Sequence, residues 1–267
     1  MMVGIASIAA MAFSLLASVA TPAAFLWYCS RHFKINGKAL GAGVAVFLVF
    51  SQVLEKLMHL YVLRWNVTTA HLMNNVWLFA VYGSLAAGLF EEGGRYLAFR
   101  YLLQKARRWE DGVSYGIGHG GAEAILIGVL GNVNNIVASL LINSGAMAKI
   151  VTQVPAADLA KFQAIQHTLI DARPELFLVS GCERAMAFLL QVALSLLVLY
   201  GVKQRNIGII ALAVLVHAAV DFPAALTQRG MISTWLVEAI VLVSAILAGI
   251  FIVRSKRLFV GSTTAAA

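Results

Sequence analysis

The segment NIGIIALAVLVHAAVDFPAALT (residues 206–227) decides the fold. It is apolar over most of its length, and roughly 20 residues are enough to cross a hydrocarbon core of about 30 Å as a helix. Two polar side chains, His217 and Asp221, interrupt its second half. Because ionisable groups are costly in lipid, such a segment is typical of a transmembrane helix that carries functional residues.

The rest of the chain repeats this pattern. Of its 267 residues, 61% are hydrophobic and only 12% are charged, whereas a soluble globular protein has about a quarter of its residues charged. We therefore expect an all-α, polytopic transmembrane bundle that forms a single domain over residues 1–260, followed by a disordered tail at 261–267. Seven helices are expected, at residues 3–29, 39–64, 75–104, 112–142, 174–200, 206–227 and 232–253.

The connecting segments carry the information on orientation. Most of the 20 Lys and Arg residues fall on every second loop, so the positive-inside rule places the N-terminus outside and the C-terminus in the cytoplasm. The formal charge of +8 lies at the ends of spans, next to the lipid bilayer, and does not indicate a nucleic-acid partner. In the longest loop, residues 156–170 fit either a short amphipathic helix at the membrane interface or a plain connection.

Three charged residues stand together in the third expected helix, at Glu91, Glu92 and Arg95. Glu91 and Arg95 are four residues apart and share a helix face, so they are expected to pair. Glu92 points about 100° away and is expected to stay free for chemistry. A structural ion pair explains Glu91 and Arg95, but it does not explain a second carboxylate beside them.

Two later helices repeat a spacing of histidine and carboxylate. His119 and Glu123 lie four residues apart, as do His217 and Asp221, so the members of each pair share a face. A carboxylate beside an imidazole fixes its tautomer and raises its basicity, whether the ring serves as a base or as a metal ligand. The glycines around His119 allow another helix backbone to approach closely.

The fifth expected helix adds Glu183, Arg184 and, two turns later, Gln191. Glu183 and Arg184 are adjacent and therefore point in different directions, so each is expected to pair with another helix. A structural role for them is as compatible with the sequence as a catalytic one. At 1.5 Å per residue, Gln191 and the residues of the other motifs reach similar depths, roughly 10–22 Å from the cytoplasmic end, and Glu183 lies further out at about 25 Å.

Together these motifs resemble the YhfC-like family of intramembrane peptidases, which is related to the PrsW-like and CAAX-prenyl-endopeptidase membrane proteases. The resemblance covers most of the chain, from the third through the sixth expected helix. It depends on a combination of short patterns, namely Glu91-Glu92-x-x-Arg95, Gly118-His119-Gly120-Gly121-x-Glu123, Glu183-Arg184 and His217-x-x-x-Asp221.

By this resemblance the paired glutamates supply the general base that activates water, and histidines of later helices complete the site. The chain departs from the family pattern at Gln191, where we expect a histidine eight residues after Glu183. Because glutamine is a poor zinc ligand, the departure favours a glutamic-type mechanism over a metal-dependent one.

We therefore expect an intramembrane endopeptidase. Glu92 is the expected base and Glu91, held by Arg95, supports it. His119 and His217, the latter oriented by Asp221, are expected to stabilise the oxyanion or to protonate the leaving amine. If a metal is bound, zinc is the expected ion, and the expected ligands are His119, Glu123 and His217; a glutamic-type enzyme would need no cofactor.

The expected substrate is a membrane protein or a membrane-anchored peptide, and the expected location is a bacterial plasma membrane. Two alternatives remain open from the sequence. Chains of acidic and histidine residues within a membrane also serve as proton relays, which would suit a proton- or ion-coupled transporter. An inactive scaffold that binds transmembrane helices is the other alternative, because Gln191 replaces the expected histidine.

Overall fold

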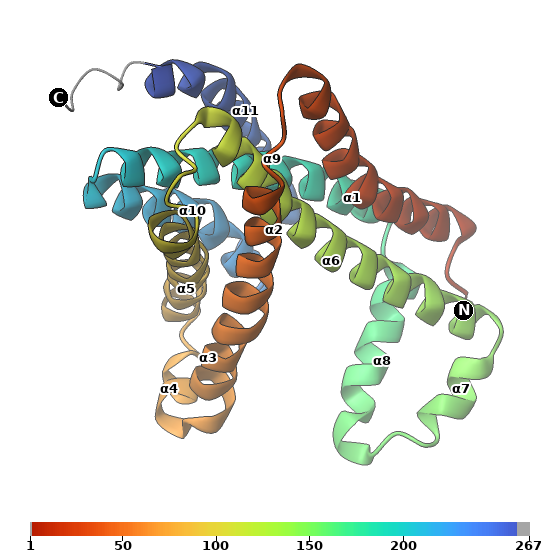
Figure 1. Ribbon diagram of the computed structural model, residues 1–267. Helices are drawn as coiled ribbons and strands as arrows, with labels where there is room; N and C mark the ends of the chain where they lie inside the picture. Colours follow the sequence, from red (N-terminus) through yellow and green to blue (C-terminus); the bar gives the residue numbers. More distant parts are fainter. Residues whose placement is uncertain (1, 261–267) are drawn as a thin grey trace. The chain divides into compact units, whose positions relative to one another are not determined.

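The computed structural model describes residues 2–260, and Figure 1 shows them as helices joined by turns. No strand occurs within this range, as expected for the all-α class. Five long single helices are α1 (Ile5–His32), α6 (Trp109–Asn143), α9 (Pro174–Lys203), α10 (Ile207–Thr227) and α11 (Thr234–Val260). The predicted tail at 261–267 lies outside the described residues.

Two further long segments combine α-helix with π-helix. The first consists of α2 (Gly37–Val46), η1 (Phe47–Glu55), α3 (Lys56–Leu60) and η2 (Tyr61–Trp65). The second consists of α5 (Val76–Leu97) and η3 (Ala98–Leu102). Three short helices complete the order: α4 (Val67–Leu72), α7 (Ala146–Val151) and α8 (Ala156–Asp171). The seven expected helices thus correspond to seven long helical segments, with ends that differ by up to seven residues.

Six of these seven segments are long and apolar enough to cross a membrane, which makes the chain an integral, multi-pass membrane protein. The exception is α5, whose charged residues Glu91, Glu92 and Arg95 lower its apolar character. The expected count of seven spans and the expected orientation therefore stay predictions.

Asparagine side chains begin several of the helices. The side chain of Asn36 accepts a hydrogen bond from the backbone N–H of Ala39 at the start of α2, and Asn75 accepts from Trp77 and Leu78 at the start of α5. Asn206 caps α10 in the same way. Such caps satisfy backbone donors that have no partner within the first turn.

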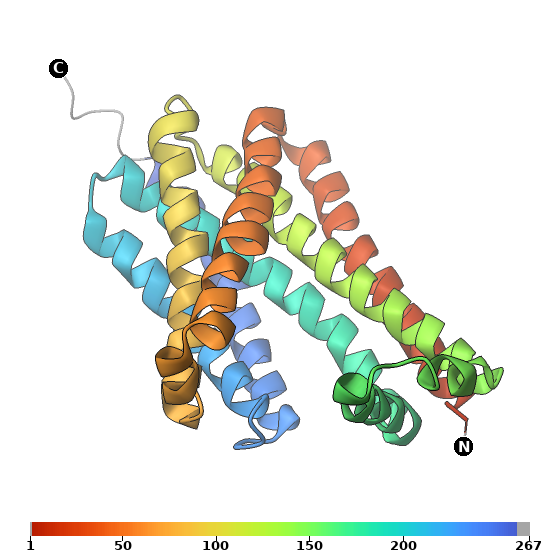
Figure 2. The same cartoon turned by 90° about the horizontal axis from the view of Figure 1, so that it is seen from below.

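The described residues form two compact parts, and the larger consists of residues 23–123 and 186–260. In this part α5 packs against α10 and against η1, and Figure 2 shows η1 beside α5. A buried apolar cluster in the same part includes Phe99 of η3, Tyr115 of α6 and Leu199 of α9.

The smaller part consists of residues 1–22 and 124–185, of which 2–22 and 124–185 are described. Its core includes Met11, Ile142 and Leu169. Between α6 and α9 the chain forms α7 and α8, which Figure 1 shows as two separate short helices. The helix α8 covers the stretch for which the sequence left a helix and a plain loop open, and its predicted place at the membrane interface stays a prediction.

Candidate functional site

The helix α5 places three charged side chains in the interior of the larger part. Glu92 and Arg95 have no exposed surface, and Glu91 is 7% exposed. Burying a charge without a partner costs more free energy than the packing of its side chain provides, so each of these charges must be paired or hydrogen-bonded. The contacts of these three residues therefore define the site.

Arg95 contacts both glutamates of its own helix. Its Nη2 donates to Glu91 Oε2 over 3.3 Å, which is the ion pair expected from the sequence. Its Nη1 also donates to Glu92 Oε1. The prediction that Glu92 stays free was wrong, because residues three apart on a helix are also neighbours and a guanidinium has enough donors for two carboxylates.

Glu91 is the point at which three other segments meet. Its Oε2 accepts from Gln191 Nε2 over 3.0 Å and lies 3.0 Å from His119 Nε2. Its Oε1 accepts from Ser51 Oγ of η1 over 2.8 Å. One carboxylate thus joins α5, α6, α9 and η1 through hydrogen bonds.

His119 is fully buried, and close helix contacts hold α6 in place around it. A side chain at Gly118 would lie 2.0 Å from the backbone oxygen of Leu40, so only glycine permits this approach of α2 and α6. This confirms the expectation that the glycines around His119 allow close packing. The ring of Phe47 meets the imidazole edge to face, with 5.3 Å between centroids.

Gln191 connects the carboxylates on two helices. Its Nε2 donates to Glu91 and to Glu123, and its Oε1 accepts from Arg95. The arginine contact fixes the orientation of the amide, because only the oxygen can accept. Since this oxygen is already engaged by Arg95, Gln191 serves in this arrangement as a donor to the two glutamates.

His217 bridges α10 to α5. Its Nδ1 lies 2.7 Å from Glu92 Oε1, and its Nε2 lies 3.4 Å from Asp221 Oδ2, so the expected pair on α10 is present. The same Nε2 is 4.0 Å from Glu91 Oε2. The side chain of His217 is 4% exposed, whereas that of Asp221 is 40% exposed. Glu92, His217 and Asp221 thus form a row from a fully buried carboxylate to a partly exposed one.

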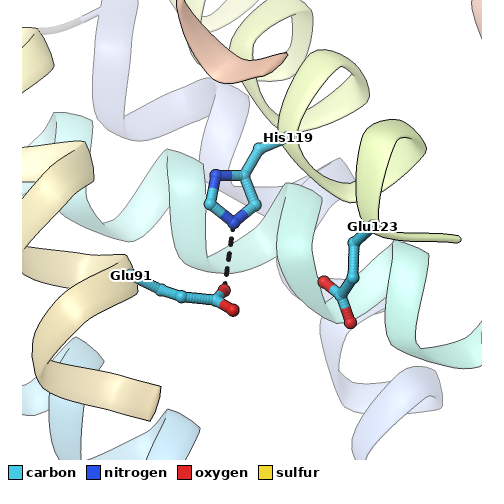
Figure 3. A group of neighbouring side chains, drawn as sticks. All are labelled: Glu91, His119 and Glu123. Atoms are coloured by element: carbon cyan, nitrogen blue, oxygen red, sulfur yellow. Dashed lines mark hydrogen bonds and ion pairs between the residues drawn. The ribbon is translucent and has the colours of Figure 1, made fainter. Parts of the chain in front are cut away.

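A group of potential metal ligands lies next to this row. Figure 3 shows Glu91 of α5 and His119 and Glu123 of α6 with their side chains directed toward one another. One donor atom from each lies within 4.8 Å of the other two. The sequence expected His217 as the third ligand, and the group contains Glu91 instead, because both ring nitrogens of His217 face the carboxylates of Glu92 and Asp221.

The chemistry of these donors fits a divalent cation. Zinc accepts imidazole nitrogen and carboxylate oxygen, and three protein ligands leave a position open for water or substrate. Two of the three candidate ligands are carboxylates, and their negative charge also favours a cation.

Glu183 and Arg184 belong to the smaller part of the chain, and Arg184 Nη2 donates to Glu183 Oε1. Two adjacent residues on a helix can pair in this way because the arginine side chain is long enough to fold back to its neighbour. The expectation that each also pairs with another helix stays a prediction.

Ser51 is the contact that sequence reasoning missed. It is buried and donates to Glu91, yet in the sequence it is a lone small hydroxyl within an apolar run. Serine is common in membrane helices, where it often bonds to its own backbone, so its residue type carries no signal. Only its position opposite Glu91 makes it part of the site.

These features define a multi-pass membrane protein with a buried site of carboxylates, imidazoles and one guanidinium. Residues 16–242 match the family described as YhfC intramembrane metalloprotease, and the chain belongs to this family. It is 38% identical over 236 residues to a Bacillus subtilis (strain 168) protein described as "Uncharacterized membrane protein YhfC", covering 88% of this chain and 90% of the relative. No solved structure matches it.

The family resemblance inferred from the short motifs is thereby confirmed, and the family description supports a membrane protease in general. It gives no support to the glutamic-type mechanism that the sequence favoured, because it names a metalloprotease. The wider relationship to CAAX-prenyl endopeptidases stays a prediction.

Proposed function

We propose that the chain is an intramembrane metallopeptidase that hydrolyses a peptide bond of a membrane protein or a membrane-anchored peptide. The observation that carries the proposal is the convergence of Glu91, His119 and Glu123, whose donor atoms lie within 4.8 Å of one another. The fully buried Glu92 stands beside this group on the same helix turn. The metal ligands, the base and the substrate class are all part of the proposal.

Glu91, His119 and Glu123 would hold the metal, with zinc as the first candidate. A bound zinc ion would supply Lewis acidity and lower the pKa of a water molecule. Gln191 and Ser51 would orient the ligand carboxylates by the hydrogen bonds they donate, and such outer contacts strongly affect metal affinity.

Glu92 is the proposed general base. Its Oε1 is engaged by Arg95 and His217, while its Oε2 is buried and accepts no hydrogen bond from the described residues. A carboxylate oxygen without a donor is available to take a proton from water. His217 lies 2.7 Å from the other oxygen and can carry the proton onward, with Asp221 stabilising its protonated ring.

Arg95 is a positioning residue in this scheme. It holds Glu91 and Glu92 in fixed orientations by hydrogen bonds to both. Its positive charge lies beside both carboxylates and offsets part of their mutual repulsion. These contacts hold Glu91 in place as the proposed ligand and Glu92 as the proposed base.

The test uses the full chain reconstituted in lipid, with a mixture of membrane-anchored peptides as substrate and mass spectrometry as readout. Metal content is measured on the same samples. We expect Glu92→Gln to keep the metal and to lose cleavage by at least about 100-fold, which is the usual contribution of a general base. His119→Ala should lose both metal and cleavage.

The exposed Arg254 provides a control, because Arg254→Gln lies outside the site and should leave cleavage and metal content unchanged. Full cleavage by Glu92→Gln would exclude Glu92 as the base. Full cleavage by a metal-free wild type would show that no metal is required and would support the glutamic-type mechanism. Proton-driven ion flux without any cleavage would contradict a peptidase and support a transporter.

A further inference from the structure

A pocket rich in arginine and lysine opens where η3 and α9 end, in the larger part of the chain. It has a volume of about 530 Å³. Its lining consists of Arg100, Tyr101, Gln104, Arg107, Val202, Lys203 and Arg205. Four of these residues are basic and none is acidic. The sequence predicts this end of the helices to face the cytoplasm.

Two neighbouring pockets extend the basic surface. One of about 390 Å³ shares Arg107 and Lys203 with the first and contains a single acidic residue, Glu110. Its further basic lining residues are Lys105, Arg108 and Lys256. The other, of about 210 Å³, shares Arg100 and Arg205 with the first. The positive charge is therefore continuous across three concavities.

Backbone contacts hold two of the cations in place. Arg107 donates to the carbonyl oxygens of Leu103 and Ala106 over 2.8 Å and 2.7 Å, and Lys203 Nζ donates to the carbonyl oxygen of Phe259 over 2.9 Å. Burial and the nearby charge of Arg100 lower the pKa of Arg107 below its usual value. Like charges are thus held close together, and an anion in the pocket would relieve their repulsion.

Arg205 has a strained backbone at this pocket. Its φ of 51° lies in the left-handed region, and it is the only residue other than glycine with a positive φ in residues 2–260. Glycine or asparagine is preferred at such a position after a helix end, because a larger side chain clashes with the backbone there. Arg205 lines two of the three pockets, so a positively charged residue occupies a position whose backbone conformation favours glycine.

We propose that these pockets bind a phosphate-bearing anion, supplied either by a phospholipid headgroup or by a soluble phosphate compound. Arginine guanidinium groups match phosphate oxygens in pairs, and Arg100 and Arg205 line the same two pockets. The positive-inside rule by itself explains basic residues at this end of the helices, but it requires neither a concave arrangement nor a strained arginine. The proposal is independent of the peptidase activity.

The test compares ligand binding by the full chain purified in detergent. Native mass spectrometry measures the retention of phosphatidylglycerol against phosphatidylcholine, and thermal melting is measured with and without inorganic phosphate. We expect saturable binding of at least one phosphate source. Arg205→Gly and Arg100→Gln should weaken it at least about tenfold, as expected for the loss of a charge-assisted contact.

A second readout separates binding from folding. Arg205→Gly should melt at the same or a higher temperature than wild type without ligand, because glycine relieves the backbone strain. The matched control is Arg254→Gln, which removes one positive charge near the same end of the molecule and lines none of these pockets. It should bind as wild type does.

Each outcome either tests the proposal or identifies the source of the bound phosphate group. Selective retention of phosphatidylglycerol with no effect of inorganic phosphate identifies a lipid headgroup, whereas saturable stabilisation by inorganic phosphate alone identifies a soluble ligand. Binding of neither overturns the proposal. Equal losses in Arg254→Gln and Arg205→Gly would also overturn it, because the effect would then come from overall charge.

Discussion

At the scale of single residues, the guanidinium of Arg95 contacts two carboxylates of its own helix and the amide of Gln191 on α9. It is fully buried, and so is one of the carboxylates. Removing one partner from a buried ionic network lowers the stability of the protein by more than the whole network contributes to it. The reason is that the remaining charges stay buried without a partner.

We therefore expect Arg95→Ala to lower the stability of the protein by about 3–5 kcal/mol, measured by chemical or thermal unfolding in detergent. Arg95→Lys keeps the charge but cannot reach both glutamates in parallel, so it should recover only part of this loss. Arg254→Ala is the exposed arginine control and should unfold like wild type. An Arg95→Ala protein as stable as wild type would contradict the buried network.

Gln191 supports the second prediction at this scale. It is 4% exposed, donates to Glu91 and Glu123, and accepts from Arg95. Gln191→Leu keeps a similar volume but leaves these buried groups without their partner, which costs about 1–3 kcal/mol. We expect reduced stability together with weaker metal retention, measured by unfolding and by metal analysis after dialysis.

The exposed Gln228 at the end of α10 is the matched control, and Gln228→Leu should change neither property. If Gln191→Leu retained metal and unfolded like the wild type, Gln191 would have no positioning role and would only be a tolerated replacement of the expected histidine.

At the scale of elements, the approach of α2 to α6 depends on glycine. A side chain at Gly43 would lie 2.2 Å from the backbone oxygen of Tyr115 and 2.8 Å from the backbone nitrogen of His119. Both atoms are backbone, so they cannot give way without moving a helix. The helix contact therefore sets the position of His119.

Gly43→Ala should separate the two helices, with a loss of about 1–3 kcal/mol in stability as in other overpacked cores. It should also lower cleavage, because His119 moves with its helix. A Cβ added at Gly41 on the same helix would meet no other atom within 4 Å, so Gly41→Ala should be neutral or slightly stabilising. Thermal melting of both variants checks the prediction, and equal behaviour of the pair would refute it.

At the scale of the whole molecule, the number of spans decides whether the two termini lie on the same side of the membrane. Six helical segments are apolar enough to cross by composition, and α5 with η3 is the seventh long segment. The charged residues of α5 are buried among other helices rather than turned to lipid, so the low apolar character of α5 is compatible with a span.

We expect seven crossings, with the N-terminus outside and the C-terminus in the cytoplasm. Reporter fusions at each end, active on one side of the membrane only, measure this directly. Opposite sides for the two ends agree with an odd number of spans. The same side for both would mean an even number of spans and would contradict the seven expected, with α5 as the first candidate for the segment that does not cross.

Much of the site was accessible from local sequence, and the reason is geometric. Pairs such as Glu91 with Arg95 and His217 with Asp221 lie four residues apart on one helix, and the period of the helix brings them together whatever the rest of the fold does. The positions of the helices were equally accessible, because the length of apolar segments reflects the thickness of the membrane.

The partners across helices were decided by the tertiary structure alone. The sequence left Glu92 free, whereas it is held by Arg95 and His217, and it contains no sign that Ser51 faces Glu91. Such contacts depend on how closely two helices approach and how they are rotated, and glycine contacts between distant segments set both. Helical periodicity describes one helix at a time, so it determines which residues share a face but not what that face meets.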